Sequence, residues 1–100
     1  MSKLRIILLG ALGGLLLAGC ATAPVQEMSD ARQAIRSAEE AGAAHYAQPQ
    51  LKRARGLLDR AQRNLESGAY YQARRLALDA REEAIRAREQ ASGLTGGQQP

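Results

Sequence analysis

The chain has 100 residues, of which 14 are Lys or Arg and 10 are Asp or Glu, giving a formal net charge of +4. A single Cys excludes a disulfide within one chain, and the absence of Phe and Trp excludes a core built on those large aromatic side chains. This length allows one small domain.

The first twenty residues are organised like a bacterial export signal. Lys3 and Arg5 precede an uncharged run rich in Leu and Ile, residues 6–17, and small residues follow it. A positive segment, a short apolar segment and a small-residue cleavage site are typical of a secretory signal peptide. The run is also shorter than the roughly 20 residues that span a bilayer core. We therefore expect residues 1–19 to be a cleaved signal peptide.

The end of this run, Leu17, Ala18, Gly19 and Cys20, resembles the lipobox of bacterial lipoproteins. The resemblance implies a covalent lipid on Cys20, cleavage before it, and acylation of the new amine by chains such as palmitate. Stable anchoring needs more than one acyl chain, which this modification supplies. Ala21 stands where Asp retains lipoproteins in the inner membrane, so the resemblance implies anchoring in the outer membrane of a Gram-negative bacterium, with the domain facing the periplasm. The alternatives are an uncleaved anchor or a buried free thiol.

Loss of residues 1–19 changes the charge balance. It removes Lys3 and Arg5 and leaves 81 residues, with 12 basic against 10 acidic side chains. Export separates the protein from DNA, and no aromatic platforms that could stack on bases are interleaved with the basic residues. We therefore expect no nucleic-acid partner.

Composition divides the rest of the chain into three parts. Residues 20–28 hold the lipidated cysteine and a Pro-containing tether. Residues 93–100 have three Gly, a final Pro and no charge, which is typical of a disordered tail. Between them, residues 29–92 form the expected alanine-rich helical domain.

Capping and helix-breaking residues divide this domain into three helices. Ser29 or Asp30 is a suitable N-cap, and Gln33 completes a capping-box pattern three residues after Asp30. Pro49 suits the first turn of a second helix, and Gly68 suits the left-handed residue after its end. The expected helices are residues 29–47, 49–67 and 69–92.

Periodic apolar residues indicate which helix faces are buried. The third helix carries an alanine stripe, which follows Tyr70 and consists of Ala73, Ala77, Ala80, Ala84, Ala87 and Ala91. It also carries a second stripe, called here the Tyr71 stripe, of Tyr71, Leu78 and Ile85. The first helix offers a matching edge of Met28, Ile35 and Gly42, with Tyr46 beside it. A small up-down three-helix bundle built on an antiparallel helical hairpin satisfies both stripes. The alternative is an open hairpin whose Tyr71 stripe is left for a partner or a second copy.

Two known families resemble parts of the chain. Residues 57–84, LLDRAQRNLESGAYYQARRLALDAREEA, resemble a tetratricopeptide-type helical hairpin, a unit that ordinarily recurs and stacks. Residues 31–87 resemble more closely the domain of unknown function 4398 family of small bacterial envelope proteins, most specifically in AEEAGAAHYA and SGAYYQAR. Ala69 departs from that family, in which a Gly-Asp-Tyr type turn is commoner. Some relatives carry an additional peptidoglycan-binding domain, which is not part of this stretch.

The candidate binding residues lie on the third helix. Arg74, Arg81 and Arg88 are seven residues apart and form an arginine row between the alanine stripe and the Tyr71 stripe. Either their stems cover the seam between helices while the guanidinium groups stay in water, or the row binds carboxylates or phosphates of the envelope. The Tyr71 stripe is a possible partner face. His45 has no second His or free Cys beside it, so we expect no metal site and place it at a helix C-terminus.

Taken together, the sequence predicts a binding or adaptor module at the cell envelope. No Ser-based catalytic motif or glycine-rich phosphate loop is present, so we expect no enzyme activity and no cofactor besides the lipid on Cys20. The expected partners are the membrane, through the lipid, and an envelope protein or peptidoglycan. Two alternatives stay open: a structural oligomer like the murein-linking lipoprotein, or an accessory subunit of an envelope complex. The oligomeric state also stays open.

Overall fold

The computed structural model describes residues 23–96. In this part, four helices and no strand are found: α2 (Val25–Glu40), α3 (Ala43–Tyr46), α4 (Gln48–Glu66) and α5 (Tyr70–Gly96). The predicted all-α class is confirmed. The expected signal peptide, the lipobox and Cys20 lie outside the described residues. Among residues 23–96, no helix combines the length and hydropathy that a membrane span requires.

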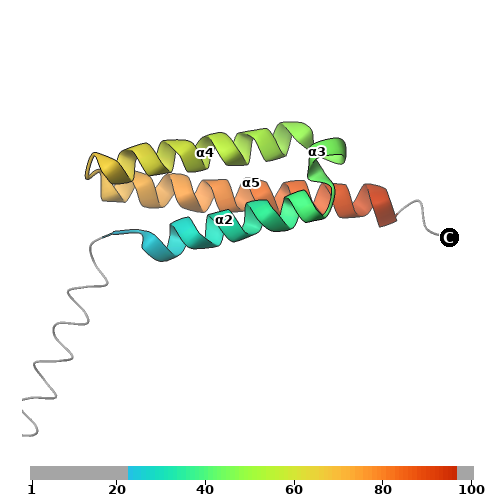
Figure 1. The fold of residues 1–100 in the computed structure, drawn as a ribbon, viewed down its shortest axis with the longest axis horizontal. Helices are drawn as coiled ribbons and strands as arrows, with labels where there is room; N and C mark the ends of the chain where they lie inside the picture. Colours follow the sequence, from blue (N-terminus) through green and yellow to red (C-terminus); the bar gives the residue numbers. More distant parts are fainter. Residues whose placement is uncertain (1–22, 97–100) are drawn as a thin grey trace, which may run out of the picture.

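The three long helices, α2, α4 and α5, lie side by side, and each contacts the other two (Figure 1). The chain runs out along α2, back along α4 and out again along α5. Short α3 connects α2 to α4 at one end of the helices. The turn between α4 and α5 lies at the opposite end, next to the start of α2. We call this second end, formed by the turn and by the first turns of α2 and α5, the hairpin end.

The first helix begins before the predicted capping box at Ser29 and Asp30. The carbonyl of Pro24 accepts the first helical hydrogen bond, from the N–H of Met28 at 3.0 Å. No side chain caps this end, and the Asp30 carboxylate instead accepts a hydrogen bond from Gln26 Nε2 at 2.9 Å. The predicted N-cap is therefore wrong, and so is the tether boundary at residue 28. Met28 is 1% exposed, and its packing keeps the earlier turn helical.

The predicted first helix, residues 29–47, is two helices. α2 ends at Glu40, Gly42 has a φ of +90°, and α3 begins directly after it. A left-handed backbone costs glycine little, which is why the helix breaks at this residue. The Tyr46 ring lies over Gly42, so that a Cβ added there would meet Tyr46 Cδ2 at 3.4 Å. The break turns the chain toward α4.

A tight turn around Gly68 joins α4 to α5. The N–H of Gly68 donates to the carbonyl of Leu65 at 3.1 Å, and the N–H of Ala69 donates to that of Asn64 at 2.8 Å. This pair of bonds is a Schellman C-cap. Gly68 has a φ of +83°, which confirms the predicted left-handed residue. Pro49 lies in the first turn of α4, as predicted.

The alanine stripe forms the centre of the core, and each of its members is 0% exposed. Buried residues of the other two long helices face it: Met28, Ala31, Ile35 and Ala38 of α2, and Leu51, Ala54 and Ala61 of α4. Met28, Leu51 and Pro24 are the largest fully buried side chains in the described residues. Because alanine adds little bulk, both neighbouring helices approach α5 closely, and few large side chains are needed to fill the space.

The Tyr71 stripe is not covered by α2. Tyr71 is 67% exposed and Leu78 is 42% exposed, while Ile85 is half-buried. Met28 and Ile35, which were expected to cover this stripe, instead join buried clusters with members of the alanine stripe. The prediction is wrong here because alanine permits close approach of α2 and α4 together, so both pack on the same stripe.

α5 continues four residues past its predicted end at residue 92. Ala91 is 0% exposed, and Gln90 Nε2 donates a hydrogen bond to the carbonyl of Tyr46 at 3.2 Å. These contacts hold the last turns of α5 against α3. Residues 93–96 of the predicted disordered tail are therefore helical, and that part of the prediction is wrong.

Candidate functional site

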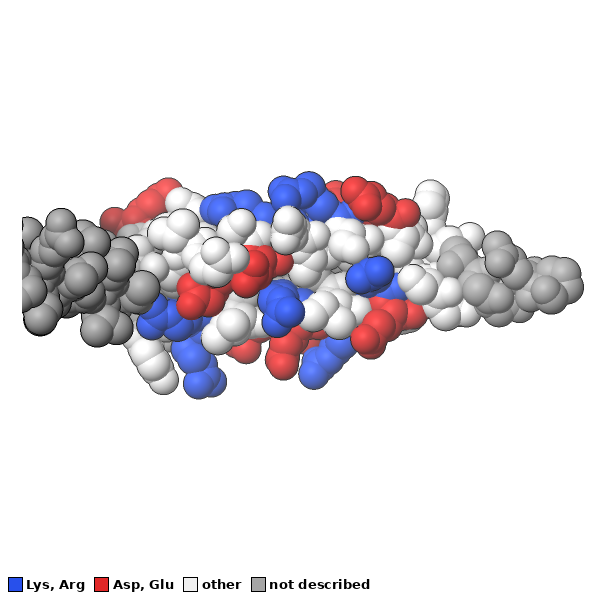
Figure 2. Space-filling model, turned by 90° about the horizontal axis from the view of Figure 1, so that it is seen from below, with Lys and Arg blue, Asp and Glu red and all other residues white. Residues whose placement is uncertain are grey.

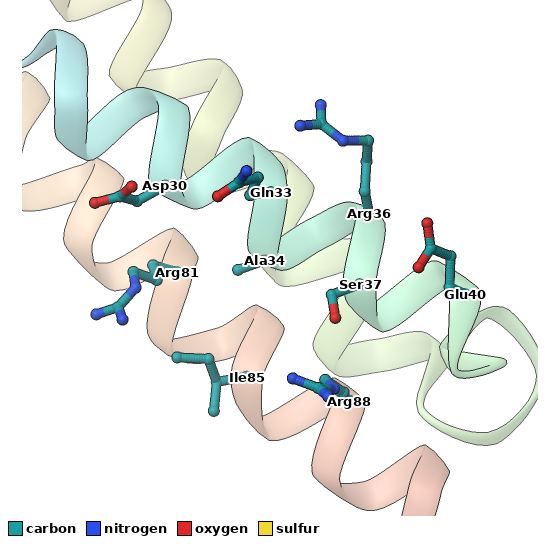
Figure 3. Close-up of a pocket in the computed structure, with 9 residues that line it drawn as sticks. All are labelled: Asp30, Gln33, Ala34, Arg36, Ser37, Glu40, Arg81, Ile85 and Arg88. Carbon is teal, nitrogen blue, oxygen red and sulfur yellow. The ribbon is translucent and has the colours of Figure 1, made fainter.

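An open groove of about 610 Å³ lies between α2 and α5 (Figure 3). Both helices supply its walls. The lining residues are Asp30, Gln33, Ala34, Arg36, Ser37 and Glu40 of α2, and Arg81, Ile85 and Arg88 of α5.

The wall formed by α5 has an apolar centre with a cation on either side. Ile85 is half-buried, and Arg81 and Arg88, both exposed, flank it along the helix. A rise of about 1.5 Å per residue places these two arginines about 10 Å apart along the α5 axis. Ala34 adds a second apolar surface on the opposite wall. The groove therefore presents two guanidinium groups around a small apolar patch.

The cations of the groove do not form ion pairs with its own acids. Asp30 and Glu40 also line it, yet among residues 23–96 the ion pairs do not include any between these carboxylates and the groove arginines. Arg36 extends away from α5 in Figure 3, which leaves Arg81 and Arg88 beside Ile85. A free guanidinium group binds a carboxylate or phosphate through two parallel hydrogen bonds. The groove can thus hold an acidic group next to an apolar one.

The arginine row is divided between two roles. Arg74 Nε lies 3.4 Å from Glu27 Oε1 of α2, and these side chains are 34% and 29% exposed. Arg74 therefore belongs to the joint between α5 and α2. Arg81 and Arg88 lie in the groove and have no ion-pair partner among the described residues. The arginine row as a whole therefore neither covers the contact between the helices nor forms one continuous anion-binding surface.

The Tyr71 stripe is divided in the same way. Ile85 lines the groove, Leu78 is exposed outside it, and Tyr71 lies at the hairpin end. Seven residues of helix separate neighbouring members by about 10 Å. The structure thus brings Ile85 together with Arg81 and Arg88, which the sequence had assigned to a different site.

The wall formed by α2 was missed by the sequence analysis. Asp30, Ala34 and Ser37 are spaced three and four residues apart, so they lie on one face of α2. That spacing is readable in the sequence, next to the buried face that contains Ala31 and Ala38. The sequence does not show which side of α5 this face of α2 approaches, because that depends on how α2 packs against α5.

Charges of both signs occur on the surface of the helices. Positive and negative side chains alternate on the face shown in Figure 2, without a broad patch of either sign. Several of them link helices: Arg55 lies 2.7 Å from Glu39 across α4 and α2, and Arg53 lies 3.9 Å from Glu83 across α4 and α5. A general basic surface is therefore absent from the face shown in Figure 2.

His45 lies in the last turn of α3 and is exposed. Its ring packs edge-on against Tyr46, with 6.4 Å between the ring centroids. Across residues 23–96, no group of three or more His, Cys, Asp or Glu side chains is placed to hold a metal ion.

Comparison with known proteins identifies the family. A family model described as a domain of unknown function (DUF4398) matches residues 26–95, which include the groove and both of its walls. Comparison with curated proteins and with solved structures gives no match. Because the match extends over well more than half of the sequence, the chain belongs to the DUF4398 family.

Proposed function

We propose that this protein is a lipid-anchored periplasmic binding module whose α2–α5 groove takes a carboxylate-bearing group of peptidoglycan. The observation that carries the proposal is the placement of Arg81 and Arg88 on either side of Ile85, without ion-pair partners in the described residues. Peptidoglycan stem peptides combine free carboxylates with alanine methyl groups. Both chemical groups suit this groove.

The helical domain acts in this proposal as a closed three-helix bundle. Mutual contact of α2, α4 and α5 supports it, with α3 as a short link between the first two. A closed bundle fixes the distance between the α2 and α5 walls, so the groove is largely preformed. Preformed sites lose less conformational entropy when they bind.

The anchor proposed at Cys20 supplies much of the effective affinity. A protein held at the outer membrane by acyl chains has a high local concentration beside the cell wall, so weak contacts in the groove suffice. The proposed role is a reversible link between the membrane and peptidoglycan, without catalysis. The lipobox residues Leu17, Ala18, Gly19 and Cys20 support this part of the proposal.

The groove is tested by co-sedimentation of the purified lipoprotein, in detergent, with peptidoglycan sacculi over a salt series. We expect binding that falls with salt and is lost in the double variant Arg81→Ala/Arg88→Ala. The matched control is Arg60→Ala/Arg63→Ala, which removes the same charge from exposed positions on α4. Equal loss of binding in both double variants would show that binding depends only on the net charge of the protein, and would reject the groove as the binding site.

The anchor is tested separately by cell fractionation. We expect the unmodified protein in the outer-membrane fraction and the variant Cys20→Ala outside it. Recovery of exported Cys20→Ala protein with the membranes would reject lipid anchoring. The sacculus result does not depend on this outcome, because detergent-solubilised protein is used there.

A second candidate function is suggested by Leu78, which is 42% exposed on α5 outside the groove. In this candidate, Leu78 makes a contact with another protein chain, as in an accessory subunit or a structural oligomer. Cross-linking of the purified lipoprotein tests the oligomer. We expect a higher-order product that disappears in Leu78→Asp if this candidate is correct, and a monomer if it is not.

A further inference from the structure

Large apolar side chains gather at the hairpin end. Val25 and Tyr71 are each 67% exposed, and Tyr70 is 41% exposed. Among residues 23–93, whose side chains the structure describes, these are three of the five large hydrophobic residues that are exposed; the other two are Leu78 and Tyr46. A concentration of exposed apolar side chains on a small domain marks a contact surface.

These three side chains come from two helices that start side by side. The Arg74–Glu27 ion pair joins the first turns of α5 and α2. Val25 precedes Glu27 by two residues, and Tyr71 precedes Arg74 by three, so each lies within about one helical turn of the pair. Figure 1 shows both helix starts at the same end of the molecule.

The proposed anchor is close to this same end in the sequence. Three residues of chain lead from Cys20 to Ala23, the first residue that the structure describes. Fully extended, they span at most about 11 Å. A lipid on Cys20 therefore holds Ala23, two residues before α2, within about 11 Å of the membrane, and no other end of the bundle is tied as closely.

We propose that the hairpin end rests on the lipid surface, with Val25, Tyr70 and Tyr71 in the interfacial layer and the bundle standing end-on. This inference rests on the proposed anchor at Cys20. Tyrosine suits the interface because its ring enters the apolar layer while its hydroxyl stays with the headgroups and water. α4 has 19 residues, so the opposite end with α3 stands about 28 Å farther out.

The charges at the hairpin end are compatible with a lipid surface. In the six residues of each helix nearest this end, 25–30, 61–66 and 70–75, the charged residues are Arg63, Arg74 and Arg75 with Glu27, Asp30 and Glu66. Basic and acidic side chains are thus equal in number there, and Arg74 and Glu27 are already paired. The hairpin end therefore carries no negative excess that would be repelled by anionic headgroups such as phosphatidylglycerol.

If the bundle stands end-on, the position of the groove relative to the membrane follows from the helix rise. Arg81 is ten residues beyond Tyr71 on α5, so the arginine pair of the groove begins about 15 Å from the hairpin end. The groove then opens beside the bundle, beyond the headgroups and toward the cell wall. A bundle lying flat would instead bring one long face against the lipid.

Tyrosine fluorescence tests the orientation directly, because the chain has no Trp and only three Tyr. The mature lipoprotein is purified from membranes and reconstituted into vesicles of phosphatidylethanolamine and phosphatidylglycerol, with or without brominated acyl chains that quench nearby fluorophores. Tyr46→Phe leaves emission from Tyr70 and Tyr71 at the hairpin end. Tyr70→Phe/Tyr71→Phe leaves Tyr46, which is 39% exposed at the opposite end and is a matched control.

We expect brominated lipid to quench Tyr46→Phe strongly and to leave the emission of Tyr70→Phe/Tyr71→Phe nearly unchanged. Equal quenching of the two variants would show a bundle lying flat and would overturn the inference. Absence of quenching in both variants, for protein that floats with the vesicles, would also overturn it while leaving the anchor intact. Protein that lacks the lipid by mass and does not float would reject the anchor and the inference with it. Circular dichroism of both variants checks that the helices are retained.

Discussion

Arg74 Nε lies 3.4 Å from Glu27 Oε1, and this ion pair joins the first turn of α5 to the first turn of α2. It removes Arg74 from the set of cations available to a ligand. It also explains why the arginine row does not act as one unit. The groove, at the level of Arg81 and Arg88, lies between the same two helices but does not include Arg74 or Glu27.

Arg74→Ala should have a small effect on stability and none on the groove. The pair is partly exposed to water, and such pairs contribute about 0–1 kcal/mol. We expect a loss of at most about 1 kcal/mol in the free energy of unfolding, smaller at high salt because of screening. Urea unfolding measures it, with Arg75→Ala as the exposed control. Loss of sacculus binding in Arg74→Ala would show that the row acts as a unit after all.

Two glycines should respond to alanine with opposite signs. Gly56 lies within α4 with open space where a Cβ would be placed, so Gly56→Ala should raise the free energy of unfolding by about 0.5–1 kcal/mol. Gly68 has the same open space but a φ of +83°, so Gly68→Ala should lower it by about 1 kcal/mol or more, through backbone strain alone. Thermal or urea unfolding of the two variants compares them. A stabilised Gly68→Ala would contradict the left-handed turn.

The alanine stripe should not tolerate larger side chains. Ala84 is 0% exposed in the cluster that contains Ile35 and Leu51. Three added carbons in Ala84→Leu have no space, and overpacking of this kind costs about 1–3 kcal/mol. Ala44→Leu, at an exposed position of α3, is the matched control. If Ala84→Leu were as stable as its control, the close contact of α2 and α4 with α5 would be wrong.

Local features of the fold were readable in the sequence. Gly68 between two amphipathic runs predicts a left-handed helix end, and Pro49 predicts a helix start, since both follow from backbone chemistry within a few residues. The alanine stripe likewise follows from spacing alone. Gly42 escaped the prediction, because a glycine inside a periodic run is compatible with a continuous helix until its φ is known.

Features that depend on packing between helices were not readable. The start of α2 follows the burial of Met28 and not the capping chemistry of Ser29. Ile85 was assigned with Tyr71 and Leu78 by its spacing, but the position of α2 places it with Arg81 and Arg88. The candidate groove therefore required the arrangement of α2 against α5, although each of its residues is visible in the sequence.

Isoleucine methyl NMR tests the groove most directly. Outside residues 1–19, the expected signal peptide, the chain has two isoleucines, Ile85 in the groove and Ile35, which is 6% exposed in the core. The purified protein, methyl-labelled in detergent micelles, is titrated with soluble peptidoglycan stem peptides. We expect a saturable shift of the Ile85 signal, a nearly constant Ile35 signal, and loss of the response in Arg81→Ala/Arg88→Ala. An Ile85 signal that does not move at any peptide concentration would show that the groove does not bind stem peptides.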